Sequence, residues 1–98
     1  MIAKLKMTKV AANVFEDLGF LREEAQILLL RSELMTRIER FAVSSELTQH
    51  EAAKRLGVTQ PRLHDVLRDK IDMFSLDALV NMLGAVGIRA TMALKEAA

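Results

Sequence analysis

The stretch LTQHEAAKRLGVTQPRLHDVL, at residues 47–67, starts a short amphipathic helix twice. Thr48 and Thr59 each precede a glutamine, and threonine is a preferred N-cap because its hydroxyl accepts a hydrogen bond from a free backbone N–H of the first turn. Gly57 separates the two segments, and a glycine after a helix readily adopts the left-handed conformation that stops it. The stretch therefore predicts two brief helices that meet at a sharp angle.

The spacing inside this stretch is that of a helix-turn-helix. Counted from Gln49, Ala53 takes the fifth position and Gly57 the ninth. The fifth position requires a small side chain because the two helices approach closely there, and the ninth requires a positive φ. The apolar residues predicted to pack between the helices and onto the core are Leu56, Val58, Leu63 and Val66.

The composition favours one mainly α domain. The chain has 98 residues, of which 51% are hydrophobic, with four aromatic residues and one proline. This composition disfavours a turn-rich β-sandwich or barrel. We predict a compact bundle of about five helices that contains the helix-turn-helix and ends in a short β-strand. An N-terminal arm is expected over residues 1–14, and a single helix-turn-helix domain over residues 15–98.

The sequence also bears on where the protein works. It contains no cysteine, which fits a reducing cytoplasm. Its N-terminus lacks the long apolar core of a signal peptide, and no run approaches the ~18 apolar residues of a membrane span. We therefore expect a cytoplasmic protein with no membrane partner.

The longest helix is predicted from about residue 23 to residue 43. At 100° per residue, Leu29 points nearly opposite to the apolar stripe of this helix. Leu29 would lie in water unless another segment or subunit covered it, so it is predicted to contribute to a dimer interface. The residues of the stripe itself are Ile27, Leu30, Leu34, Ile38 and Phe41.

The last part of the chain combines a helix with a strand. Ser75 is a predicted N-cap and Gly87 a predicted helix end, after which IRATMALK alternates as a strand does. A lone strand leaves its backbone groups unpaired. Residues 3–9 offer a partner within the chain, but two copies of the strand paired about a two-fold axis solve the problem more completely. The strand residues predicted for dimerisation are Ile88, Ala90, Met92 and Leu94.

The motif as a whole resembles the Xre family of phage-repressor-like helix-turn-helix proteins, through LTQHEAAKRLGVTQPRLHDVLRDK. The flanking segments NVFEDLGF and FSLDALVNMLGAVGI are similar to the small Xre regulators that include HigA-type antitoxins. The resemblance implies a compact homodimer that binds its own operator, a palindromic site in double-stranded DNA. Where a toxin is encoded beside such a protein, the resemblance also implies that it neutralises a RelE-like ribonuclease.

The family pattern implies roles for single residues. Gln49 and Thr59, at the two helix starts, are expected to bind phosphate and fix the register without reading sequence. Gln60 is the expected base reader, because its amide matches the donor and acceptor at N6 and N7 of adenine. Arg62 is suited to guanine or to a phosphate, and the sequence leaves both open. His64 is suited to a base edge or a phosphate, or is a solvated surface histidine.

The positive residues after the second helix extend this expected interface. Arg68 and Lys70 are predicted to contact the DNA backbone. Asp65 would repel phosphate, so it is expected to pair with Arg62 or Arg68, or to mark a direction in which the DNA does not lie. The full predicted DNA-binding set is Gln49, Thr59, Gln60, Pro61, Arg62, His64, Arg68 and Lys70.

Other functions are less well supported by the residues. The net charge of +1 does not by itself indicate a nucleic-acid binder. His50 and Glu51 diverge by about 100° on a helix, and no metal-binding spacing or glycine-rich phosphate loop occurs. We therefore expect no enzyme activity, no metal and no cofactor. The alternative to DNA binding is a helical protein-interaction module that occludes a partner protein.

Overall fold

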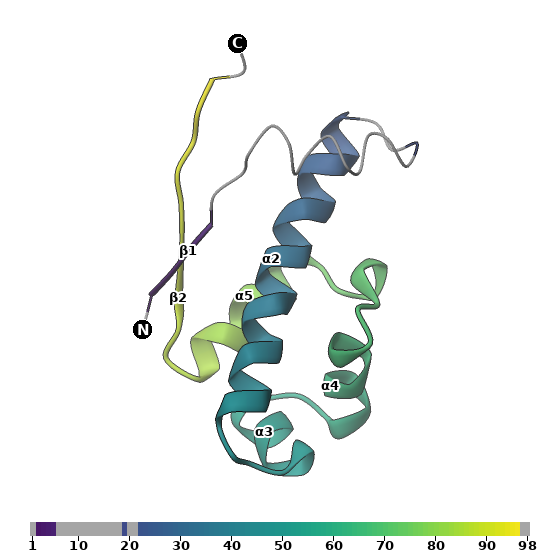
Figure 1. Ribbon diagram of the computed structural model, residues 1–98, viewed down its shortest axis with the longest axis vertical. Helices are drawn as coiled ribbons and strands as arrows, with labels where there is room; N and C mark the ends of the chain where they lie inside the picture. Colours follow the sequence, from purple (N-terminus) through teal and green to yellow (C-terminus); the bar gives the residue numbers. More distant parts are fainter. Residues whose placement is uncertain (1, 6–18, 20–21, 97–98) are drawn as a thin grey trace.

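A computed structural model of the chain describes residues 2–5, 19 and 22–96. Within these residues the protein is mainly helical, with four α-helices, a short 3-10 helix and a short strand at each end (Figure 1). The element order is β1 (Ile2–Leu5), α2 (Arg22–Ser44), α3 (Gln49–Leu56), α4 (Gln60–Leu67), η1 (Ile71–Met73), α5 (Leu76–Ala85) and β2 (Arg89–Met92). The sequence predicts about five helices, slightly more than are present here.

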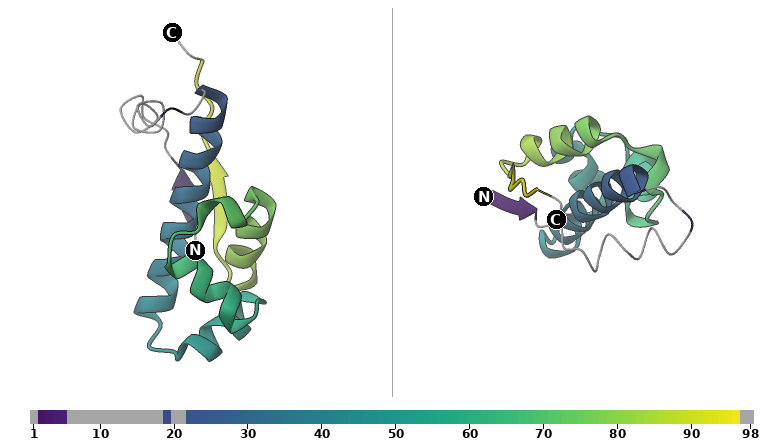
Figure 2. Two further views of the ribbon diagram at one scale, coloured as in Figure 1. Left: turned by 90° about the vertical axis from the view of Figure 1, so that its right-hand side faces the viewer. Right: turned by 90° about the horizontal axis from the view of Figure 1, so that it is seen from above.

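The core forms along one face of the long helix α2. This helix contacts α4, η1 and α5, and Figure 2 shows α5 beside α2 with the two strands at one side of the molecule. Leu30, Leu34 and Ile38 of the predicted stripe are buried, and Phe41 is partly buried against the same core. The largest side chains that are fully buried in the core are Phe74, Leu34, Met35, Ile38, Leu56, Leu63, Leu79, Leu83 and Val66.

Two predictions for α2 are wrong. Leu29 is only 7% exposed in the single chain, so another segment of the same chain covers it and it is not a surface for dimerisation. Ile27, placed in the core stripe by its helical angle, is 42% exposed. Ala25 is also buried and lies about 40° from Leu29 around the helix axis. The first turns of α2 therefore bury a different face from the one that α4 and α5 cover.

The predicted start and end of α5 are confirmed. The Ser75 hydroxyl accepts a hydrogen bond from the Ala78 N–H at 3.1 Å, and Gly87 follows the helix with a φ of 79°. The Ile88 N–H then donates to the Leu83 carbonyl at 3.0 Å. This turn directs the chain from α5 into β2, which α5 contacts.

The two strands pair with each other in parallel. Ile2 is opposite Arg89 and Leu5 is opposite Met92. The start of the chain is thus a strand, although the sequence predicts an arm there, because β2 offers unpaired backbone groups that an isolated extended segment can join. Parallel strands need a long crossover connection, and the helical body supplies it.

The pairing changes the interpretation of the residues predicted for dimerisation. Ile88 is buried in the core of its own chain and Ala90 packs partly against that core, so neither offers a free surface. Met92 and Leu94, further along, are 55% and 83% exposed. The large apolar side chains of this segment that remain exposed to another molecule are therefore at its end.

Some predictions lie outside the described residues. Residues 6–14 of the predicted arm are among these, and of the flanking segment NVFEDLGF only Gly19 is described, with a φ of 96°. No helix within residues 22–96, where all the described helices lie, is long and apolar enough to span a bilayer.

Two glycines separate a backbone requirement from a packing requirement. A Cβ added at Gly57 or at Gly84 would meet no atom within 4 Å, but Gly57 has a φ of 76°, whereas Gly84 lies within α5. We expect Gly57→Ala to lower the free energy of unfolding by about 1–2 kcal/mol, because a side chain disfavours the left-handed conformation. Gly84→Ala, the matched control, should raise it by about 0.5–1 kcal/mol. Urea unfolding of both variants tests this, and equal effects would contradict it.

Candidate nucleic-acid interface

The first helix of the motif has a well-formed start and end. The Glu51 N–H donates to the Thr48 hydroxyl at 3.1 Å, and that hydroxyl lies 3.2 Å from the Glu51 carboxylate, so Thr48 is the predicted N-cap. At the other end, the Gly57 N–H donates to the Lys54 carbonyl at 3.2 Å and the Val58 N–H to the Ala53 carbonyl at 3.0 Å. These paired bonds satisfy free carbonyls of α3 and turn the chain sharply.

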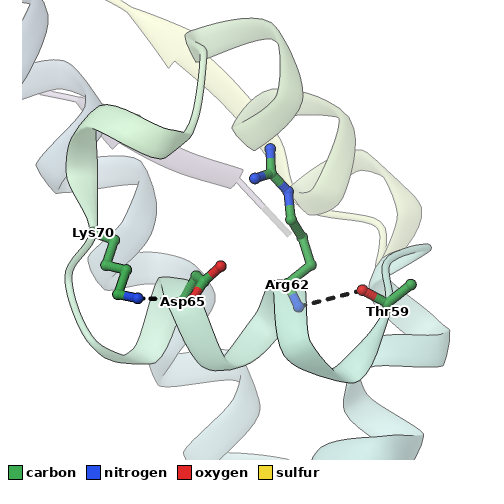
Figure 3. Close-up of polar contacts among 4 residues, drawn as sticks. All are labelled: Thr59, Arg62, Asp65 and Lys70. Atoms are coloured by element: carbon green, nitrogen blue, oxygen red, sulfur yellow. Dashed lines mark hydrogen bonds and ion pairs between the residues drawn. The ribbon is translucent and has the colours of Figure 1, made fainter.

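The second helix of the motif starts immediately after this turn. Thr59 is its N-cap and accepts a hydrogen bond from the Arg62 N–H at 3.3 Å (Figure 3). Pro61 lies in the first turn, where a missing N–H costs nothing. Ala53 is 1% exposed, and Leu63 and Val66 are fully buried. The close packing of α3 against α4 that the sequence predicts is therefore confirmed.

Four of the predicted DNA-binding residues line one open hollow on the surface. Gln49, Gln60, Pro61 and His64 line a volume of about 420 Å³ together with Asp65. The first four are exposed. Gln49 and Gln60 are the first residues of α3 and α4, so the N-terminal ends of both helices meet at this hollow. Such ends carry partial positive charge and free N–H groups that favour phosphate.

Arg62 lies apart from the hollow. Its guanidinium carbon is 4.0 Å from the centroid of the Phe74 ring, and its side chain is only partly exposed. Figure 3 shows this side chain extending away from Thr59, with the guanidinium separate from Asp65 and Lys70. The Arg62 side chain thus contacts Phe74, a residue of the protein core.

Asp65, the acidic residue of α4, pairs with neither of the two arginines predicted as its partner. Asp65 forms an ion pair with Lys70 at 3.3 Å, rather than with Arg62 or Arg68 (Figure 3). Lys70 remains about half exposed, and Arg68 is exposed as the C-cap of α4. The Lys70 charge is partly compensated within the protein, so Arg68 is the freer cation at this end of the helix.

The sequence does not predict the pair of carboxyl groups of Glu39 and Asp69, which lies at the end of α4. Burial, a hydrogen bond with Asp69 and the negative charge of Asp69 together raise the pKa of Glu39 to about 7. Glu39 lies on α2, and Asp69 follows α4 with a φ of 56°. Asp is one of the few non-glycine residues that enters this conformation readily, which is the one sequence signal for such a turn. The pair links α2 to the end of α4.

These features define a helix-turn-helix, the class of domain that places its second helix in the major groove of DNA. A family model described as a helix-turn-helix domain matches residues 14–95, most of the chain. The chain belongs to that helix-turn-helix family, which supports DNA as its partner. The chain has no significant match among curated proteins. Within the part that the structure describes, no cluster of three or more His, Cys, Asp or Glu side chains could hold a metal ion.

The raised pKa of Glu39 predicts a pH-dependent stability. A carboxyl whose folded pKa lies near 7 instead of 4.5 stabilises the fold fully below pH 4.5 and loses that contribution as the pH rises through 7. Glutamine resembles the protonated form at every pH. We therefore expect Glu39→Gln to raise the melting temperature at about pH 8 and to leave it nearly unchanged at about pH 4.5. Thermal unfolding followed by circular dichroism measures the melting temperatures. Glu96→Gln, at an exposed residue, is the control. An equal rise in melting temperature at both pH values would contradict a raised pKa of Glu39.

Proposed function

We propose that this protein is a sequence-specific transcriptional repressor that places α4 in the major groove of an operator. The observation that carries the proposal is that Gln49, Gln60 and His64 line the same hollow, at the N-terminal ends of α3 and α4. Gln60 and His64 are four residues apart, so they lie on one face of α4. That face is exposed, whereas Leu63 and Val66 lie on another face of α4, which is buried in the core.

The proposed roles follow from the chemistry of these side chains. Gln60 reads a base, because an amide pairs through a donor and an acceptor with adenine N6 and N7. His64 donates to a base edge or a phosphate one turn further along. Gln49 and the free N–H groups beside it bind a phosphate and fix the register. Arg68 contacts the DNA backbone beyond the end of α4.

The alternative is an interaction module that binds a protein and leaves DNA alone. The two functions differ in their dependence on salt, because each phosphate contact releases counterions and steepens the loss of affinity as salt is added. A titration of operator DNA at several salt concentrations tests the proposal. A steep salt slope supports the repressor, and the absence of binding at low salt would reject it.

We propose further that the working unit is a homodimer joined through the end of β2. β1 occupies one edge of β2 and the other edge faces no strand among the described residues, while the exposed Met92 and Leu94 lie at its end. Two copies related by a two-fold axis would place two recognition helices about 34 Å apart on a palindromic site. Because the net charge is only +1, useful affinity requires the phosphate contacts of both copies.

An antitoxin function in the cytoplasm is the narrower form of this proposal. It is supported by the resemblance of the flanking segments to HigA-type regulators, whose partner is a RelE-like toxin. An adjacent reading frame for a small basic RelE-like protein, and a complex of the two proteins on purification, would support it. A repressor without such a neighbour would act alone on its operator.

The base-reading role of Gln60 predicts a loss confined to specific DNA. Gln60→Ala should weaken operator binding by about 1–3 kcal/mol and relax the preference at one base pair. Gln26→Ala, the same change at an exposed position of α2, should leave both properties unchanged. Fluorescence anisotropy with operator and random duplexes measures the effect. Equal losses on the two duplexes would exclude base reading by Gln60.

The dimer predicts that charge at the end of β2 separates the copies. We expect Met92→Glu combined with Leu94→Glu to give a monomer at micromolar concentration and to lower operator affinity at least about tenfold. Val43→Glu, at a 79% exposed apolar residue of α2, should remain a dimer with unchanged affinity. Sedimentation equilibrium and DNA titration test this. A monomeric wild-type protein that still binds the operator would show the dimer to be wrong.

A further inference from the structure

Arg62 has both its backbone and its side chain fixed within the protein. Its N–H donates to the Thr59 cap at 3.3 Å, and its guanidinium lies 4.0 Å above the Phe74 ring. A guanidinium within about 6 Å of a ring centroid is attracted to the negative face of the ring, and the attraction grows as the pair leaves water. Arg62 is only partly exposed and Phe74 is buried, so this contact is partly shielded from solvent.

The contact joins two parts of the fold that the backbone leaves separate. Arg62 belongs to the first turn of α4, and Phe74 stands between η1 and α5, directly before the Ser75 cap. The Phe74 ring is part of the same buried cluster as Leu63 and Val66 of α4. A side chain that reaches from the exposed start of α4 to this ring limits how far α4 can rotate about its buried face.

We propose that Arg62 is a positioning residue, which sets the orientation of the recognition helix through Phe74 and leaves the reading of bases to Gln60 and His64. The inference rests on the proposed function. It assigns Arg62 a role different from a direct contact with guanine or phosphate. The planar guanidinium suits this role, since it can stack on an aromatic face while its stem packs on apolar neighbours.

Positioning and direct contact predict different DNA-binding profiles. If Arg62 orients α4, its loss lets α4 sample wrong angles, and every base contact of the helix weakens together. If Arg62 contacts a base, only one base pair loses its preference. If it contacts a phosphate, binding weakens on all sequences and the salt slope falls by about 1.

The decisive experiment compares Arg62→Met, Phe74→Leu and the double variant with the wild type. Each is titrated with the operator, with operators changed at single base pairs, and with random DNA at several salt concentrations. We expect each single variant to lose about two- to tenfold in operator affinity, spread over all the base pairs that α4 reads. The salt slope and the affinity for random DNA should remain unchanged. The double variant should bind as the weaker single variant does, because both changes break the same contact.

Several results would overturn the inference. These are a loss of preference at one base pair, a reduced salt slope in Arg62→Met, or losses that add in the double variant. Circular dichroism shows whether Phe74→Leu folds. If it does not, the base-pair profile and the salt slope of Arg62→Met still distinguish positioning from direct contact. A wild-type protein that binds no DNA would reject the proposed function and this inference together, whereas a binding wild type with a direct-contact profile would reject the inference alone.

Discussion

The close approach of α3 and α4 at Ala53 is the constraint on which the rest of the interface depends. A buried methyl group at this position lets the two helices meet, and the left-handed Gly57 turns the chain at the angle that this contact requires. The two helix starts then come together, which brings Gln49 and Gln60 to one hollow. A larger side chain at Ala53 would force the helices apart, and the hollow would lose its shape before any polar residue changed.

Arg62 of α4 and Lys70 beyond it have partners within the protein, whereas Lys54, Arg55 and Arg68 are exposed. Arg62 stacks on Phe74, and Lys70 pairs with Asp65. The exposed residues of the hollow are Gln49, Gln60, Pro61 and His64, and the partly buried Asp65 also lines it. Uncharged amides read bases by geometry and add little to non-specific attraction, which depends on phosphate contacts. The proposed repressor, with a net charge of +1, would rely on these amides for selectivity and on the proposed second copy for affinity.

The sheet links the ends of the described chain across the helical body. β1 and β2 pair in parallel although they lie at opposite ends of the sequence. Because α5 contacts β2 and α2 contacts β1, the sheet connects α2 with α5. The exposed Met92 ends β2 and the exposed Leu94 follows it, so the strand that closes the fold also leads into the surface proposed for a second copy.

The sequence by itself determined the features that depend on neighbouring residues. Thr48, Thr59 and Ser75 are caps because a hydroxyl meets an N–H three residues on, and Gly57 is left-handed because only glycine adopts that conformation freely. The buried residues of the motif and the β2 strand follow from periodicity in the same way. This local information was enough to place Gln49, Gln60 and His64 on the exposed side of the motif.

Only the tertiary structure decided the features that need a distant partner. Leu29 is buried and Ile27 is exposed, because the packing of the whole chain decides which face of α2 is covered. β1 is a strand because β2, at the other end of the chain, pairs with it. Arg62 meets Phe74 for the same reason. A helical angle gives the direction in which a side chain points. It does not give the residue that the side chain contacts, because that depends on how the helices and strands pack.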